Sequence, residues 1–600
     1  MTIAEVERRT DEPNERAASR VALNASGVWI SRLDAALASS DQTALEELLH
    51  ADSHWRNLSG ISWSIRTYSG RHRIASELIR RAKEAVAVNF ILDPHVLQPR
   101  GNVVAGRAVI ESVFRYESKN GPGEGVVRLT QSPDDPTWRA WTFSTALDIE
   151  RICRDRSRNH VPQSHARDFA EPTWLEQRDV EVSYNDRDPE VLVVGGGHAG
   201  LSAAVELKRL GRDVLVIDRE KRVGDNWRLR YDGLKLHNKT PINHLRYMPF
   251  PVTFPEFLPK DKVANWLEGY VDAMDINFWT EATFKSAAYD EGNQVWKVQI
   301  ERAGSATREV HPKHIVLATS VSGTPNIPLI PTLESFQGTV LHSSEFSDAE
   351  QWRSRPVLVI GTGTSAHDIA QELHAHGAKV SMVQRNPTLI VNIDPSAQIY
   401  DQIYLSDGPA IEVRDLLNSS IPYPVARMAH KLITRKVKEL DADLLDRLRK
   451  VGFKLDFGED ETGWPLKFRT RGGGYYFNVG CSDLIADGDI ELIQATDIQR
   501  FTPGGLTLND GRTVKTDAVV LGTGFKGQDH VVNTLFGDAI AERVGTIWGL
   551  DPSYHELRNM WTRTQQPGLW FTGGAFSMCR IYSRFMALQI DAIEDGRLEK

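Results

Sequence analysis

Hydrophobic positions first recur with a helical period shortly after residue 27. In VWISRLDAALASSDQTALEELL a polar run separates one helix from a second short one, and the first helix has its apolar face at Trp29, Leu33 and Ala36. Residues 1–22, which come before it, are charged and poor in apolar side chains. Such a segment buries too little apolar surface to order itself, so we expect a disordered tail there.

Strand-like runs follow one more helical segment. VVAGRAVIESVFRYES, GVVRLTQS and TWRAWTFSTALDIE cluster or alternate apolar residues in the manner of strands. Helices followed by antiparallel strands predict an α+β domain over residues 23–152. The charged, proline-containing stretch 153–189 has no apolar period and predicts a linker along the surface.

The pattern changes at residue 191, where VLVVGGGHAGLSAAVELKRLGRDVLVID predicts strand, turn, helix and strand. Gly195, Gly197 and Gly200 form G-x-G-x-x-G, in which absent side chains let the backbone approach a pyrophosphate at the helix N-terminus. Asp218 ends the second strand, where a carboxylate can accept the ribose hydroxyls of an adenosine. Further candidate contacts in this unit are His198, expected to contribute its backbone only, Ala199 and Arg219. An ordinary strand-to-helix turn is the alternative, which the register of strand, helix and acid disfavours.

A second unit of the same kind appears in PVLVIGTGTSAHDIAQELHAHGAKVSMVQR. Its turn reads G-x-G-x-x-A, and its candidate cofactor contacts are Gly361, Gly363, Thr364, Ser365 and Ala366. Gln384 and Arg385 stand where the first unit has its acid. Because a guanidinium can pair with a 2′-phosphate through two hydrogen bonds, this favours NADPH, with NADH as the alternative. Arg385 has a second interpretation as a solvated arginine at a strand end.

Two dinucleotide units imply two dinucleotides, of which one is a tightly held flavin and the other a nicotinamide that delivers hydride to it. Between the two units, FQGTVLHSSEF at residues 336–346 matches F-x-G-x-x-x-H-x-x-x-[YF]. This motif resembles the signature of flavin-containing monooxygenases and related N-hydroxylases, whereas type I Baeyer-Villiger enzymes carry Trp at the last position. RYDGLKLH, MPFP and GLWFTGGAFSM are similar to the plant auxin-forming flavin monooxygenases. The resemblance covers about residues 190–600 and implies a class B monooxygenase with FAD in the first unit and NADPH in the second.

The resemblance also suggests further cofactor contacts. Gly224, Asp225 and Trp227 form the pattern G-[GD]-x-W, which in this family lies along the flavin. IVLATS and VVLGTGF resemble the family's two A-T-G elements, strands that end beside the dinucleotides, and they supply Ser320 and Gly524. Ser320 stands where the first element has glycine, which is a departure from the family pattern.

The segment ALASSDQTALEELLHADSHWRNLSG resembles the opening of the cone-shaped SnoaL or nuclear-transport-factor-like (NTF2-like) fold. The expected fold class is therefore α/β, with two Rossmann-like domains for FAD and NADPH preceded by an α+β NTF2/SnoaL-like domain. The FAD domain is expected over 190–345 and 516–600, and the NADPH domain over 346–515 with a helical insertion at 394–470. An N-terminal extension is typical of the family's type II members. Because cone folds often dimerise, the extension could gate substrate or join the subunits of a homodimer.

The resemblance implies that O2 is activated as a C4a-(hydro)peroxyflavin and that one oxygen atom passes to a small organic substrate, as sulfide or amine oxidation or Baeyer-Villiger oxidation of a ketone. In the family, a side-chain amide near the start of the segment before the P-F-P run helps to hold a hydrogen bond to flavin N5, and type II members tend to carry histidine there. Matching LKLHNKTPINHLRYMPF places His237 there, with Asn238 as the alternative for a one-residue offset. His342 of the signature motif is the third candidate catalytic residue, and scaffold between the domains is its alternative role.

Composition excludes several other classes. Hydrophobic residues make up 41% and charged residues 25%, which is typical of a globular chain. The net charge of −9 comes without a basic block, which argues against nucleic acid as a partner. The N-terminus lacks an apolar signal core and no apolar run is long enough for a membrane helix, so we expect a cytoplasmic protein that does not enter membranes. No metal-ligand spacing is visible, and no C-x-x-C joins the cysteines at 153, 481 and 579, which argues against a dithiol reductase.

Two other functions use the same dinucleotide folds. An NADPH oxidase or flavin reductase would release hydrogen peroxide, and the complete signature motif speaks against it. A flavin-binding module without enzymatic activity would not need both glycine loops, Asp218 and Arg385.

Overall fold

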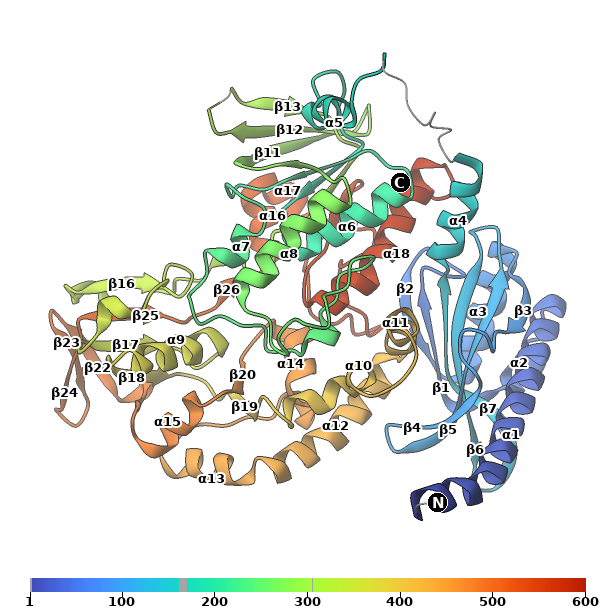
Figure 1. The fold of residues 1–600 in the computed structure, drawn as a ribbon, viewed down its shortest axis with the longest axis horizontal. Helices are drawn as coiled ribbons and strands as arrows, with labels where there is room; N and C mark the ends of the chain where they lie inside the picture. Colours follow the sequence, from blue (N-terminus) through green and yellow to red (C-terminus); the bar gives the residue numbers. More distant parts are fainter. Residues whose placement is uncertain (1–2, 161–169, 305, 600) are drawn as a thin grey trace.

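The computed structural model describes residues 3–160, 170–304 and 306–599. It consists of an N-terminal domain, drawn in blue in Figure 1, and two α/β domains formed by the rest of the chain. The N-terminal domain packs against the α/β part, where it reaches helix α18 (Phe576–Glu594). Within the described residues, no helix combines the length and the apolar character needed to cross a membrane.

The N-terminal domain is a seven-stranded sheet with three helices against it. Its strands are ordered β2-β1-β7-β6-β5-β3, with β4 on β5, and all pairs are antiparallel except β1 with β7. Its elements are α1 (Ile3–Ser39), α2 (Gln42–Glu47), β1 (Leu49–Leu58), β2 (Ile65–Ser69), α3 (Arg71–Ala85), β3 (Val88–Leu92), β4 (Arg100–Val104), β5 (Arg107–Glu117), β6 (Gly123–Ser132) and β7 (Asp135–Leu147). Trp29, Trp55 and Phe143 meet in its core. Helices and a mainly antiparallel sheet are the content expected of an α+β domain.

Helix α1 begins at Ile3, inside the segment 1–22 for which we expected disorder. We based that expectation on the composition of this segment alone. Ala22, Ala25 and Trp29 bury one face of the same helix in the domain core. Packing of this face stabilises the helix from residue 22 onward.

The stretch 153–189, expected as a linker, contains regular structure. Its helices are α4 (Ile149–His160) and α5 (Trp174–Ser183). Helix α5 buries no residue and is stabilised at its start by a capping box between Thr173 and Glu176. Residues 161–169 of this stretch lie outside the described residues. Because local caps rather than an apolar stripe support α5, the hydrophobic pattern did not reveal it.

The first α/β domain contains a five-stranded parallel sheet in the order β10-β9-β8-β14-β27. Its strands are β8 (Val191–Val194), β9 (Val214–Ile217), β10 (Asn277–Trp279), β14 (His314–Leu317) and β27 (Leu569–Phe571). Helix α6 (His198–Arg209) connects β8 to β9 and packs against α18. Strands β8, β9 and β14 are buried along their whole length, as a parallel sheet covered by helices requires. An antiparallel sheet follows β10, formed by β11 (Ala282–Asp290), β12 (Val295–Arg302) and β13 (Arg308–Val310).

The second α/β domain contains a parallel sheet in the order β16-β25-β17-β18-β21. Its strands are β16 (Thr339–His342), β17 (Pro356–Ile360), β18 (Lys379–Gln384), β21 (Glu491–Gln494) and β25 (Ala518–Leu521). This pairing corrects two expected boundaries, because β16 and β25 lie outside 346–515 and were assigned to the first domain. Strand pairing is a long-range property, and a motif on either side of these strands does not reveal which sheet they join.

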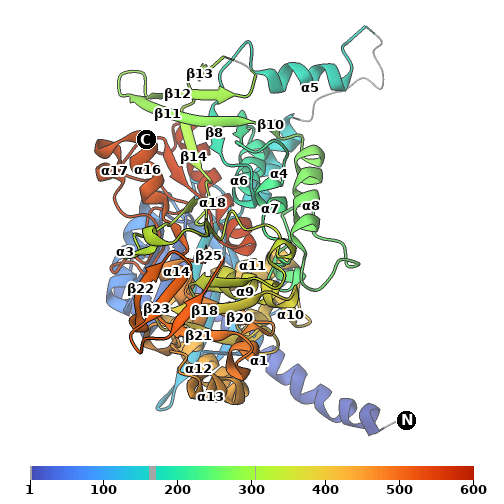
Figure 2. The same ribbon diagram turned by 90° about the vertical axis from the view of Figure 1, so that its left-hand side faces the viewer.

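Several helices separate β18 from β21. They include α10 (Gln402–Leu405), α11 (Ile411–Ser419), α12 (Tyr423–Leu440), α13 (Ala442–Lys450) and α14 (Gly463–Arg471). Other helices and strands of the two α/β domains are α7 (Asp225–Arg228), α8 (Lys260–Ala273), α9 (Thr364–Ala375), α15 (Cys481–Asp487), β19 (Leu389–Asn392), β20 (Tyr475–Asn478), β15 (Thr324–Pro325) and β26 (Phe525–Lys526). In Figure 1 the insertion, drawn in orange and yellow, lies along the lower side of the molecule, and α10 and α11 reach the N-terminal domain. Figure 2 shows the molecule turned by 90°, with α12 and α13 again at its lower end.

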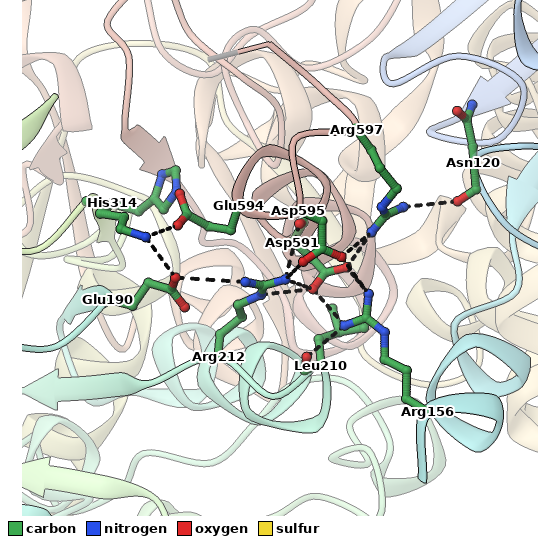
Figure 3. A network of polar contacts seen from close by, with 11 residues as sticks. Asn120, Arg156, Glu190, Leu210, Arg212, His314, Asp591, Glu594, Asp595 and Arg597 are labelled. Atoms are coloured by element: carbon green, nitrogen blue, oxygen red, sulfur yellow. Dashed lines mark hydrogen bonds and ion pairs between the residues drawn. The ribbon is translucent and has the colours of Figure 1, made fainter. Parts of the chain in front are cut away.

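An ion network holds the C-terminal end of α18 (Figure 3). The Asp591 side chain is fully buried and accepts hydrogen bonds from Arg156 at 2.7 Å, Arg212 at 2.6 Å and Arg597 at 2.7 Å. Arg597 also donates to the backbone oxygen of Asn120 in the N-terminal domain, at 3.2 Å. One buried carboxylate therefore joins α4, the turn between α6 and β9, and the segment that follows α18.

We predict that Asp591→Asn lowers the free energy of unfolding by about 3 kcal/mol, because it leaves several guanidinium groups around a buried neutral amide. The control is Asp595→Asn, since Asp595 shares these partners but is about one-third exposed. We expect that variant to lose less than about 1 kcal/mol. Urea unfolding of both variants tests this, and equal losses would contradict the assigned role of Asp591.

Candidate active site

The turn between β8 and α6 brings two backbone segments into direct contact. Gly195 has φ +107°, and a Cβ there would lie 2.5 Å from the carbonyl oxygen of Ala318 at the end of β14. A Cβ on Gly200 would lie 2.0 Å from the carbonyl oxygen of Gly195. Asp218, directly after β9, accepts a hydrogen bond from the Gly196 N–H at 2.6 Å. The turn and the acid thus meet at the carboxyl edge of the sheet, where a Rossmann domain holds its dinucleotide.

The turn between β17 and α9 repeats this arrangement. Gly361 has φ +122°, and a Cβ there would lie 2.2 Å from the carbonyl oxygen of Gly522 at the end of β25. Ala366 is buried beneath Gly522, and the Thr364 hydroxyl donates to the Tyr475 carbonyl oxygen at 3.0 Å. Arg385, after β18, is exposed and forms no hydrogen bond or ion pair with the rest of the described chain.

One cavity of about 990 Å3 reaches both turns. The predicted site residues in its wall are Gly195, Gly197, His198, Ala199, Asp218, Arg219, Asp225, Trp227, His237, Asn238, Ser320, Gly363, Thr364, Ser365 and Gly524. Those outside the wall are Gly200, Gly224, His342, Gly361, Ala366 and Arg385. Gly200, Gly224, Gly361 and Ala366 instead lie in tight backbone contacts that support the wall. The structure therefore brings together candidates from both dinucleotide units in a single space.

His237 and Asn238 lie side by side in the cavity wall but differ in their bonding. The Asn238 side-chain amide donates to Asp401 Oδ2 at 3.0 Å. The His237 imidazole packs edge-on against Phe477, with ring centroids 4.6 Å apart, and neither ring nitrogen has a partner among the described residues. Burial lowers the pKa of His237 to about 4, so its ring is neutral at pH 7. Its nitrogens are therefore free to form a hydrogen bond with a ligand in the cavity.

His342 is bonded as scaffold. It is buried at the end of β16, and its Nε2 lies 3.0 Å from the carbonyl oxygen of Gly524. Its Nδ1 lies 2.8 Å from the Ser344 hydroxyl, so both ring nitrogens have partners. Burial lowers its pKa below the ordinary value. This geometry favours the alternative in which His342 fixes the segment that joins the two domains, because its ring does not face the cavity.

Two other candidates owe their positions to local contacts. The His198 imidazole stacks on Phe576, with centroids 4.1 Å apart, and its Nε2 lies 2.8 Å from the carbonyl oxygen of Gly574. The side chain thus ties α6 to the start of α18, beyond the backbone role we expected. Ser320 has φ +71°, the left-handed conformation that glycine adopts without strain. A serine therefore stands at a position where glycine would be free of strain.

The helical insertion contributes cavity residues that the sequence analysis did not identify. They are Tyr400, Asp401, Asn418, His430, Trp464 and Arg469. Burial raises the pKa of Asp401 to about 7, which the Asn238 hydrogen bond and the Arg469 charge oppose. The Arg469 guanidinium forms no hydrogen bond or ion pair with other described residues. No local motif marks these positions, because only the fold brings the insertion over the glycine turns.

The first glycine turn and its surroundings fit a bound dinucleotide. A side chain is sterically excluded at Gly195 and Gly200, where a pyrophosphate would need the backbone to approach. Two side-chain donors near the turn, Trp227 Nε1 and Thr319 Oγ1, are buried without a partner among the described residues. Both residues lie in the cavity wall, and a ligand there would satisfy them.

Comparisons with known proteins agree with this architecture. Residues 192–404 match the family model described as pyridine nucleotide-disulphide oxidoreductase. The chain is 30% identical over 338 residues to a protein named probable indole-3-pyruvate monooxygenase YUCCA10 from Arabidopsis thaliana, covering 56% of this chain and 81% of that protein. It is 28% identical over 341 residues to indole-3-pyruvate monooxygenase YUCCA1 from Oryza sativa subsp. japonica, covering 56% and 77%.

Solved structures show the same fold. A cyclohexanone monooxygenase from Rhodococcus sp. Phi1 bound to NADP+ superposes with a TM-score of 0.50 at 17% identity, covering 68% of this chain and 87% of that chain. A cyclohexanone-bound cyclohexanone monooxygenase gives 0.51 at 17% identity, covering 68% and 88%. The family model's name includes disulphide chemistry, but Cys481 and Cys579 are buried, free thiols. Class B monooxygenases of this kind use FAD and NADPH, and this chain belongs to the flavin-containing monooxygenase family.

Proposed function

We propose that this protein uses NADPH to reduce its FAD and then transfers one oxygen atom of O2 to a small organic substrate inside the cavity. The observation that carries the proposal is the single cavity that reaches both glycine turns and includes His237. The bound cofactors supply hydride transfer and oxygen activation, and the protein binds and orients them and excludes water. We propose Gly195, Gly197 and Asp218 as contacts of FAD, and Gly363 and Arg385 as contacts of NADPH.

His237 is the proposed hydrogen-bond partner of flavin N5. Its lowered pKa keeps the imidazole neutral, so it can accept or donate one hydrogen bond without bringing a charge into the cavity. The packing against Phe477 fixes the ring. Asn238 has its amide engaged by Asp401, which supports His237 over its neighbour for this role.

The substrate proposed here carries a carboxylate. Among ketones, sulfides and amines, a carboxylate-bearing ketone is favoured because the unpaired Arg469 lies in the cavity wall together with the aromatic rings of Tyr400 and Trp464. The names of the YUCCA relatives specify indole-3-pyruvate, an aromatic 2-oxo acid, as the substrate of those proteins. The competing function is an NADPH oxidase that releases hydrogen peroxide.

We also propose that the N-terminal domain has the NTF2/SnoaL-like cone fold. Support comes from three helices packed against one mainly antiparallel sheet.

Flavin binding should depend on the close contact at Gly200. Gly200→Ala would place a methyl group 2.0 Å from the Gly195 carbonyl oxygen and push α6 away from the turn. We expect the FAD content of the purified protein to fall at least about fivefold. The control is Gly27→Ala, a helical glycine whose Cβ would have no atom within 4 Å. The ratio of flavin to protein absorbance measures the effect, and equal flavin content in both variants would contradict it.

The second prediction separates His237 from Asn238. His237→Leu replaces the imidazole with an apolar side chain of similar size and so removes the proposed hydrogen bond, and we expect peroxide released per NADPH to rise about tenfold. Asn238→Ser serves as the neighbouring control and should change this ratio less than about twofold. Peroxide and NADPH assays provide the measurement. The reverse pattern would identify Asn238 as the partner.

The third prediction concerns the substrate. Arg469→Met should raise KM for an aryl 2-oxo acid by about 10- to 100-fold, because a charge-assisted hydrogen bond is lost. KM for a neutral aryl ketone should stay unchanged, and a comparable rise for both would refute the carboxylate subsite.

Titration of Asp401 in the cavity wall should make KM for the acid depend on pH. Because the pKa of Asp401 is raised to about 7, this side chain is neutral below pH 7 and negative above it. KM for the acid should therefore rise as pH increases through about 7, while Asp401→Asn should give a flat KM profile. A pH-independent KM in the unmodified protein would contradict this assignment.

A further inference from the structure

Helix α11 of the insertion packs against the sheet of the N-terminal domain. Arg128 of β6 is buried and paired with Glu111 at 2.8 Å. The same guanidinium donates to the Leu417 carbonyl oxygen at 3.1 Å and to the Ser420 hydroxyl at 2.9 Å. Apolar side chains of the domain, including Val113, pack in the same cluster as Leu417. The contact therefore combines buried apolar packing with directed hydrogen bonds.

A second buried arginine holds the end of the same helix. Arg56 of β1 is 5% exposed and donates to the Ser419 carbonyl oxygen at 2.5 Å. It forms two hydrogen bonds with Glu556, at 2.8 and 2.6 Å, and a third with the Tyr582 hydroxyl at 3.0 Å. Tyr582 belongs to α18 and lies in the cavity wall. Arg56 thus joins the N-terminal domain, α11 and α18 at one point. A further hydrogen bond, to the Ile421 carbonyl oxygen at 3.4 Å, occupies the fifth N–H of the guanidinium, so loss of any partner leaves buried polar groups unpaired.

Helix α11 in turn fixes the backbone that follows His237 and Asn238. Asp415 of α11 forms two hydrogen bonds with Arg580 of α18, at 2.7 and 2.8 Å, and both side chains are buried. Arg580 then donates to the carbonyl oxygens of Ile242 and His244, at 2.9 and 2.7 Å.

The residue between them completes the link. The Asn243 side-chain amide donates to the carbonyl oxygen of Asn238 at 2.9 Å. Hydrogen bonds, joined by the backbone of α11 and by the peptide bond between Ile242 and Asn243, therefore connect the N-terminal domain through Arg580 to the residues beside the proposed oxygen-activating position.

We propose that Arg56 is a positioning residue for oxygen transfer: through α11 the N-terminal domain holds the segment 237–244 in place, so that the cavity stays closed to water around His237. This rests on the proposed function of the cavity. Displacement of a positioned side chain by about 1 Å is enough to lose most of a catalytic effect. The domain is then a support for the active site, with no chemistry of its own.

The test uses the full-length, FAD-loaded protein with NADPH and O2 as the only reactants. The flavin is reduced by NADPH without oxygen, O2 is admitted, and the return of oxidised flavin and the peroxide released are followed. For Arg56→Met we expect an unchanged rate of reduction and a return of oxidised flavin at least about fivefold faster than in the unmodified protein. Arg56→Lys keeps the charge without the two-pronged geometry and should restore part of the slow return.

The matched control is Arg156→Met. It also breaks an ion pair between the N-terminal region and α18, but at Asp591, eleven residues along the helix from Arg580 or about 16 Å away. We expect this control to return oxidised flavin at the unmodified rate. Should Arg56→Met fail to fold, Glu556→Gln weakens the same junction with less change in shape and is expected to accelerate the return as well.

Two failures can be told apart. If the unmodified protein returns oxidised flavin slowly and the Arg56 and Glu556 variants do the same, or if the Arg156 control accelerates equally, the positioning role is wrong while the proposed function stands. If the unmodified protein itself returns oxidised flavin at once with one peroxide per NADPH, the proposed function is wrong, and the positioning role is overturned with it.

Discussion

The geometry of the two α/β domains depends on two close contacts between backbone segments, each of which leaves no space for a side chain. At Gly195 the chain passes the carbonyl oxygen of Ala318, and at Gly361 it passes that of Gly522. Each contact fixes a helix N-terminus at the carboxyl edge of a parallel sheet, where two dinucleotides can be held by backbone donors. Because both edges open into one cavity, two dinucleotides held at the turns would face the same space.

The cavity is completed by parts of the chain that carry no nucleotide motif. The insertion covers it with aromatic and charged side chains, and α18 runs beside it with Arg580 near its start and Asp591 near its end. Buried arginines hold the insertion and α18 in place. They are Arg56 and Arg128 in the N-terminal domain and Arg580 in α18. A buried arginine must satisfy several donors at once, so each of these residues specifies one arrangement of three segments rather than one pair contact.

Sequence patterns predicted the parts of the fold that local chemistry determines. The glycine turns, the strand-helix-strand units and the position of Asp218 follow from short motifs whose residues meet within one supersecondary unit. The patterns were less informative where contacts are long-range. They assigned β16 and β25 to the wrong sheet, and they missed Asp401 and Arg469, which reach the cavity only because the insertion folds over it. For His342 the motif gave the position, and the structure added that both ring nitrogens are bonded to the scaffold.

The central claim is that oxygen from O2 enters a substrate in this cavity. Turnover of the FAD-loaded protein with NADPH under 18O2, using aryl 2-oxo acids, sulfides and amines as separate substrates, tests it most directly by mass spectrometry together with a peroxide assay. The account predicts a product with one 18O atom from at least one of these substrates and less than one peroxide per NADPH. Unlabelled substrates throughout, with all the oxygen consumed recovered as peroxide, would contradict it and identify an NADPH oxidase.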